Sequence, residues 1–333
     1  MCGARVDFCG ARISKVTRFS GISRKNCLMI RTVFLIVLNT ILSGSLVFAG
    51  SGLRDADPDS LFFREAEDSL HAMATRIVVP EKDEDRLQNN REFKAYLNEV
   101  LAREKSFNYP FDSLTTVSVL YAPDEDFRLF TWYVPLSGRQ FRYFGYLQRG
   151  NEAALNDAFY ELTDNTGQIR VEEAGALNPD SWYGAYYYEM IHHQDEQGSN
   201  VYTLLGWKGD NPQTRIRVIE PLVIRDGDPV FGHTAFDGPY AENHRVIFEY
   251  SAAVSMSLLY EREFYQKGDS LRHMIVFDRL EPLNEGLRGH YQFYKPEVNI
   301  FDGMYLEDGR WVLVKDVDAR MPAPARMPAP EEK

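Results

Sequence analysis

The stretch "SLTTVSVLYAPDEDFRLFTWYVP", Ser113–Pro135, is where the chain changes from a helical pattern to a strand pattern. Two runs of β-branched and aromatic residues flank the polar turn "APDED", which is typical of a β-hairpin. Further runs of this kind follow, and Asp-Gly pairs at 226–227 and 308–309 are strong hairpin signals. We count about ten strands with short turns and no alternation with helices. The pattern predicts an antiparallel β-sheet or β-sandwich over residues 113–318.

Two amphipathic helices are predicted before this region, within residues 50–112. The first begins at Asp57, a good N-cap residue, and at Pro58, a residue favoured in the first helical position, and Pro80 ends it. The second covers Glu84–Phe107, where apolar residues recur at helical spacing. The predicted fold class is therefore α+β, with an N-terminal helical segment packed on a mainly antiparallel β-sheet or β-sandwich region.

The beginning of the chain has the features of an export signal. Residues 29–49, "MIRTVFLIVLNTILSGSLVFA", contain Arg31, an apolar run of 16 residues and a small residue, Ala49, at the cleavage position. The apolar run spans about 24 Å as a helix, less than a hydrocarbon core of about 30 Å, which favours a cleaved signal peptide over an anchor. We interpret residues 1–28 as an extension upstream of a true start at Met29. We expect an exported protein of the periplasm or cell envelope, or a secreted one, with no transmembrane helix after cleavage.

Cysteine content and charge exclude several classes of function. All three cysteines lie within residues 1–28, so the chain left after cleavage contains no disulfide, thiol nucleophile or cysteine-bound metal. Removal of residues 1–49 takes away seven basic residues and one acidic residue, and the formal net charge changes from −12 to −18. This acidic chain shows no basic patch, which argues against a nucleic-acid partner. Residues 319–333, "ARMPAPARMPAPEEK", predict a disordered Pro-rich tail.

The segment "EMIHHQDEQ", Glu189–Gln197, is the first candidate for chemistry. If residues 182–193 form a strand, His192 and His193 point to opposite faces and cannot share a metal ion. The spacing also differs from the H-E-x-x-H pattern, so we predict no metal site and interpret the polar residues that follow as a hairpin turn. No phosphate-binding glycine loop, calcium loop or nucleophile elbow is present, and no cofactor is predicted.

The aromatic run "WYGAYYY", at 182–188, is the second candidate. In a strand it places aromatic side chains on both faces. One hypothesis is that Trp182, Tyr183 and Tyr187 mark a binding surface on which sugar rings stack. The interpretation that we favour is a strand covered on both sides, by a second sheet and by the N-terminal helices, because aromatic residues mainly supply buried core.

Several phrases of the β-rich region are distinctive, among them "WYGAYYYEMI", "YTLLGWKGDN" and "FDGMYLEDGRWVLVKDVDAR". With them, most of residues 114–320 resembles an uncharacterised exported-protein family of Bacteroidota-type bacteria. The resemblance implies export and a β-rich fold. It implies no activity, ligand or catalytic residue.

Two functions follow from this sequence. The first is a non-enzymatic binding or structural module of the cell envelope, for a protein or glycan partner. The alternative is a periplasmic hydrolase whose catalytic residues come together only in the fold, with His192, His193, Asp278 and Glu281 as candidates. A cleft with convergent carboxylates would favour the hydrolase, and an accessible aromatic surface would favour the binding module.

Overall fold

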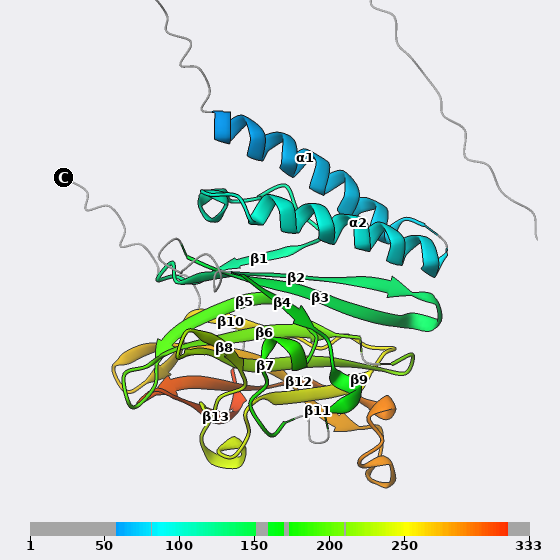
Figure 1. The fold of residues 1–333 in the computed structure, drawn as a ribbon. Coiled ribbons are helices and arrows are strands. Elements are labelled where there is room, and N and C mark those ends of the chain that lie inside the picture. The colour runs from blue at the N-terminus through cyan, green and yellow to red at the C-terminus, as the bar shows by residue number, and fades with distance from the viewer. Residues whose placement is uncertain (1–57, 81, 151–158, 170–172, 210, 319–333) are drawn as a thin grey trace, which may run out of the picture. The chain divides into compact units, whose positions relative to one another are not determined.

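The computed structural model describes residues 58–80, 82–150, 159–169, 173–209 and 211–318. The predicted upstream extension 1–28, signal peptide 29–49 and tail 319–333 lie outside the described residues. Within the described chain, two helices precede thirteen strands (Figure 1). The helices are α1 (Pro58–Val78) and α2 (Asp83–Leu101). Neither is long and apolar enough to cross a membrane, nor is any other helix in the described part of the chain.

Helix α2 is shorter than the sequence predicts, because it ends at Leu101 and not at Phe107. Lys105 has a left-handed backbone conformation, with φ of 66°, and Ser106–Asn108 form a short 3-10 turn. The Ser106 hydroxyl donates to the Leu101 carbonyl oxygen at 2.7 Å, which occupies a group that the helix end leaves free. The chain turns here so that Ser106 and Phe107 become buried.

The strands form three sheets, and every named strand pair is antiparallel. The first sheet has the order β1-β2-β3-β4, with bounds Ser118–Tyr121, Phe127–Leu136, Gln140–Arg149 and Phe159–Thr163. The second has the order β5-β6-β7-β8, with β9 also paired to β7, and bounds Tyr186–Gln194, Asn200–Lys208, Thr214–Arg225, Asp228–Phe231 and Val246–Ser251. The third has the order β10-β11-β12-β13, with bounds Leu258–Lys267, Ser270–Pro282, Tyr294–Glu307 and Arg310–Val317. The predicted α+β class is confirmed.

Two of the predicted turns fall where the sequence placed them. Asp226-Gly227 joins β7 to β8, and Asp308-Gly309 joins β12 to β13. Both aspartates have positive φ, as a tight hairpin turn requires. The strand count is higher than the roughly ten expected from hydrophobic runs, because some runs are interrupted. One example is the break between Ser251, where β9 ends, and Leu258, where β10 begins.

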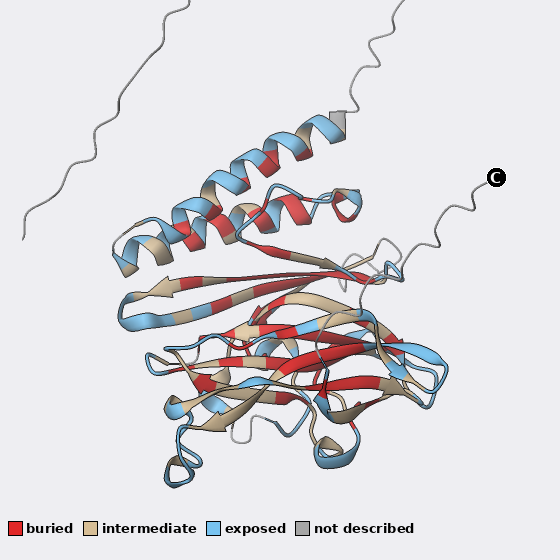
Figure 2. Cartoon of the chain, turned by 180° about the vertical axis from the view of Figure 1, so that it is seen from behind, coloured by how far each residue is buried: buried red, intermediate tan, exposed pale blue. Residues whose placement is uncertain are grey.

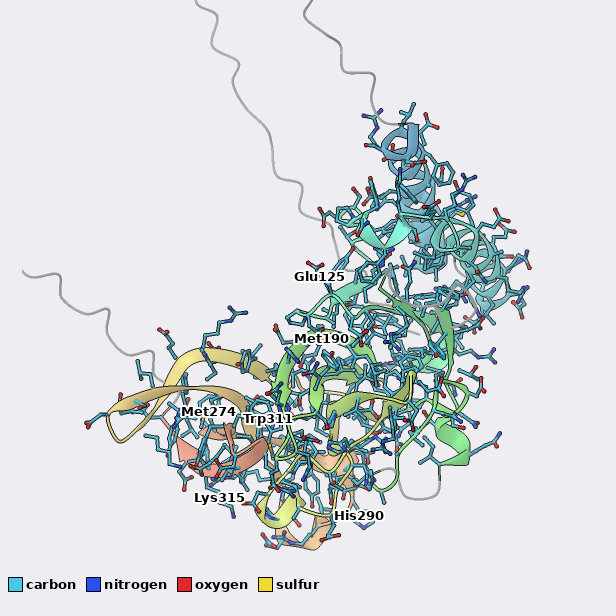
Figure 3. All side chains as sticks on the ribbon, turned by 60° about the vertical axis from the view of Figure 1, so that its left-hand side comes forward. Glu125, Met190, Met274, His290, Trp311 and Lys315 are labelled. Atoms are coloured by element: carbon cyan, nitrogen blue, oxygen red, sulfur yellow. The ribbon has the colours of Figure 1, made fainter. Side chains whose placement is uncertain are left out.

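Apolar side chains form clusters between successive layers, and Figure 2 colours the buried residues of the helices and sheets red. The first cluster joins the helices to one face of the first sheet and includes Phe93 of α2 and Trp132 of β2. The second lies between the first and second sheets, with Phe127 and Tyr202 among its members. The third lies between the second and third sheets and includes Trp311. Figure 3 labels residues at each level, among them Glu125 in the β1–β2 turn of the first sheet, Met190 of β5 in the second sheet and Trp311 of β13 in the third.

Candidate functional site

The two adjacent histidines of β5 belong to opposite faces of the second sheet, as alternation along a strand predicts. The ring of His192 stacks on Tyr202, with centroids 5.0 Å apart. Its Nε2 lies 3.9 Å from a carboxylate oxygen of Asp124, in the β1–β2 turn of the first sheet. His193 faces the third sheet, where its ring meets Trp311 edge-on at 5.6 Å. The histidines therefore lie at two different interfaces.

His193 has the surroundings of a neutral core residue. Its Nε2 lies 3.0 Å from the hydroxyl oxygen of Thr203, and the same hydroxyl accepts the indole N–H of Trp311 at 2.9 Å. The hydroxyl proton can therefore be donated to His193. Burial is the main reason why the pKa of His193 is lowered to about 4. Its contacts are those of a structural residue.

The predicted carboxylates lie on β11 of the third sheet and contact other groups. Asp278 accepts the backbone N–H of Ser257 at 2.6 Å, and Glu281 forms an ion pair with Lys295 of β12. Each of the four hydrolase candidates thus contacts a different partner residue. Across the described ranges, no three histidine, cysteine, aspartate or glutamate side chains gather closely enough to hold a metal ion.

Trp182, Tyr183 and Tyr187 are fully buried, so they do not form the exposed stacking surface considered above. The Trp182 indole N–H donates to the Tyr187 hydroxyl at 3.1 Å, and that hydroxyl donates to the carboxylate of Glu220. The Nε of Arg245 donates to the other oxygen of Glu220 at 2.6 Å. The Arg245 guanidinium also lies over the ring of Tyr183, 5.7 Å from its centroid. The rings are buried because they pack in the apolar cluster between the first and second sheets, and the network supplies hydrogen-bond partners to the polar groups that are buried with them.

The remaining tyrosines of the same run, Tyr186 and Tyr188, are half-buried and line a cavity of about 520 Å³. We call this cavity the aromatic cleft. Its walls come from the end of α1, the segment before β1, and strands β2, β5, β6 and β7. The lining residues are Ala74, Ile77, Val78, Thr115, Thr116, Val117, Trp132, Tyr133, Tyr186, Tyr188, Trp207 and Arg217.

A cross-strand row forms one wall of the aromatic cleft. Tyr186 of β5 pairs with Trp207 of β6, and Trp207 pairs with Arg217 of β7. Tyr133 of β2 reaches this row from the first sheet. Its ring meets Tyr186 edge-on at 5.8 Å and lies tilted against Trp207 at 5.4 Å. Each of these four side chains is half-buried, so the row keeps part of its surface accessible.

The cleft exists because β1 is short. It pairs only with residues 128–131 of β2, so the same edge of β2 from 132 to 136 has no strand partner among the described residues. Arg86 of α2 covers part of this edge by donating to the Pro135 carbonyl oxygen at 3.0 Å. The end of α1 closes the cleft on the other side, and Val78 keeps 39% of its surface exposed there. The opening is therefore built by the strand lengths of the first sheet.

The polar side chains that line the cleft carry hydroxyl groups, except for one positively charged arginine. Burial is the main reason why the pKa of Tyr186 is raised and that of Tyr188 is raised to about 12, so both hydroxyls keep their protons. Within the described chain, no residue hydrogen-bonds to the hydroxyls of Tyr133 and Tyr186. Thr115 and Thr116 add two more hydroxyls, and Arg217 supplies the charge.

Two other cavities are more polar and less suited to hold a ring-shaped ligand. One, of about 360 Å³, includes Asp195 and His233, with a carboxylate oxygen of Asp195 3.6 Å from Nε2 of His233. The other, of about 760 Å³, includes Lys208. The Lys208 ammonium already contacts Thr166 Oγ1 and two backbone carbonyl oxygens, Tyr183 O and Gly184 O, each at 2.7 Å.

Comparison of the chain with protein-family models, with curated proteins and with solved structures found no match. The resemblance to an exported family stays a prediction. Sequence reasoning did not single out Tyr133, Trp207 or Arg217. The sequence does contain an aromatic residue in each of the three strands concerned, Tyr133 in β2, Tyr186 in β5 and Trp207 in β6. The contacts that bring these residues together are not local in the sequence.

Proposed function

We propose that this is an exported protein of the cell envelope that binds a glycan in the aromatic cleft. The observation that carries the proposal is the row of half-buried aromatic side chains from two sheets, Tyr133, Tyr186 and Trp207, which faces a cavity. Many other aromatic side chains of the described β-rich region are buried in the core, among them Trp132, Trp182 and Trp311. In this row, the packing leaves the rings accessible at one side.

The size and chemistry of the cleft suit one or two sugar rings. Its volume of about 520 Å³ is within the range of small-ligand sites, roughly 300–1,000 Å³. A pyranose ring has an apolar face that packs on an aromatic ring and a rim of hydroxyl groups that needs hydrogen bonds. The hydroxyls of Tyr133, Tyr186, Thr115 and Thr116 can supply those bonds. Mostly apolar walls with a few polar groups are the usual composition of such sites.

Export belongs to the same proposal and is supported by the sequence of residues 29–49. The expected processing is cleavage after Ala49. N-terminal sequencing of the protein recovered from an envelope fraction tests it. A chain that retains residues 29–49 in the mature protein would contradict the cleaved signal peptide.

A protein segment is the second candidate ligand. The observation that favours it is the open edge of β2 beside the cleft, at residues 132–136, because an extended peptide can add to such an edge as a further strand. An aromatic side chain of the peptide would then enter the cleft. Pro135, which has no N–H, and the contact from Arg86 both limit this pairing, and the glycan is therefore our first choice.

The test is a binding screen of the protein from Gly50 against envelope and extracellular oligosaccharides by calorimetry. We expect at least one to bind, and Tyr186→Ala to weaken that binding by roughly five- to tenfold, as expected for a stacking residue that contributes about 1–1.5 kcal/mol. The control is Tyr291→Ala, which truncates an exposed tyrosine outside the cleft. Equal losses in both variants, or no binding of any saccharide, would refute the glycan proposal.

A further inference from the structure

Arg217 is the charged residue of the aromatic cleft, and its partners are neutral. Its Nε donates to the carbonyl oxygen of Met256 at 3.0 Å. Its guanidinium lies over the ring of Tyr188, 5.4 Å from the centroid, and is close to the hydroxyls of Tyr188 and Tyr250. In the described part of the chain, Arg217 forms no ion pair with a carboxylate. A guanidinium has five N–H groups, so these acceptors leave donors for a ligand.

Other arginines near the interior are compensated or enclosed. Arg245 pairs with Glu220, and Arg279 contacts two aspartates. Arg128 has only neutral hydrogen-bond partners, but it is completely buried among aromatic rings and borders none of the three cavities above. Arg217 differs because it combines neutral partners with a position on the wall of an open cavity.

A partly desolvated positive charge without a counter-ion favours an anion at that place. Water screens it less than it screens a surface charge, and the attraction to an anion is correspondingly stronger. The planar guanidinium matches a carboxylate by paired hydrogen bonds. A single arginine balances one negative charge, which suits a carboxylate better than a doubly charged phosphate.

We propose that Arg217 binds the carboxylate of a hexuronic acid unit whose ring packs on Tyr186 and Trp207. This inference rests on the proposed glycan function and narrows the ligand to an acidic saccharide. The ring then occupies the aromatic row, and the carboxylate lies at the end of that row formed by β7. The pairing order Tyr186, Trp207, Arg217 sets this direction.

The test compares acids with their methyl esters, because esterification removes the charge and keeps the sugar ring. The probes are oligomers of galacturonic, mannuronic, guluronic and glucuronic acid, each with its methyl ester, titrated at low salt. We expect at least one acid to bind roughly tenfold or more tightly than its ester, and added salt to reduce that ratio. Arg217→Gln should bring the ratio close to one.

The matched control is Arg215→Gln. Arg215 lies two residues away on the same face of β7, over Phe141 and outside the set of cleft-lining residues, so this variant should keep the ratio. If Arg217→Gln does not fold, two other measurements test the proposal. They are the salt dependence of the acid-over-ester ratio in the wild type and the same ratio in Arg217→Lys, which keeps the charge. Equal binding of acid and ester would overturn the role of Arg217 and leave the glycan function standing. Binding of neutral saccharides alone would do the same, and binding of no saccharide would overturn both proposals.

Discussion

Replacement of Arg245 by methionine should expose how strongly the core depends on its buried ionic network. Arg245 and Glu220 are both fully buried, with the Nε and Oε1 atoms 2.6 Å apart. The guanidinium also contacts the carbonyl oxygens of Gly175 and Phe231 at 3.2 and 3.3 Å. Methionine fills a similar volume but leaves the carboxylate without its counter-ion. The Tyr187 hydroxyl remains as a donor to that carboxylate.

Loss of one partner from a buried ion pair costs about 3–5 kcal/mol. That is a large share of a typical free energy of unfolding of about 5–15 kcal/mol. At about 2–4 °C per kcal/mol for a chain of this size, Arg245→Met should lower the melting temperature by about 6–20 °C. The double variant Glu220→Leu, Arg245→Met removes both charges, and it should be at least as stable as Arg245→Met alone.

The assay is urea unfolding of the wild type and both variants at pH 5 and pH 8. In Arg245→Met, burial favours the protonated form of the unpaired Glu220 carboxyl, so the folded state binds more protons than the unfolded state. Stability of this variant then falls as the pH rises. The deficit relative to the wild type should be larger at pH 8 than at pH 5. A deficit below about 1 kcal/mol, or one that does not change with pH, would refute the reasoning.

Three further changes test other parts of the structure. Burial lowers the pKa of His193 to about 4, below the usual value of 6.5, so the unfolded state binds more protons between these values and stability is lost as the pH falls. In urea titrations between pH 7 and pH 4.5, the wild type should lose about 2 kcal/mol more unfolding free energy than His193→Gln. Equal losses in the two proteins would contradict this. Gly206→Ala places a Cβ 2.8 Å from the ring of Tyr187 and should lower the free energy of unfolding by about 1–3 kcal/mol, measured by thermal unfolding. The control Gly167→Ala, whose Cβ has no atom within 4 Å, should leave stability unchanged. Similar effects of the two variants would contradict the packing described. Arg128→Lys cannot reach the acceptors that the buried guanidinium holds and should cost at least about 2 kcal/mol of unfolding free energy, so a neutral result would speak against that network.

Local signals in the sequence were sufficient for the fold class and for several of its turns and faces. Asp-Gly pairs favour tight turns because one backbone position needs positive φ, and both predicted hairpins formed at them. The helical spacing of Phe93 and Leu97 placed one face of α2 in the core. Alternation along β5 predicted that His192 and His193 would separate. These features depend on neighbouring residues, and a sequence displays them directly.

The tertiary structure alone decided which aromatic residues bury and which remain accessible. The run 182–188 has aromatic side chains on both faces, and a register irregularity between Tyr187 and Glu189 shifts the alternation. Tyr187 enters the space between the first and second sheets, while Tyr186 joins Tyr133 at the edge that the short β1 leaves uncovered. Strand lengths in another sheet set this outcome. A pattern within one strand cannot contain it, because the burial of a side chain depends on the sheet that packs against it.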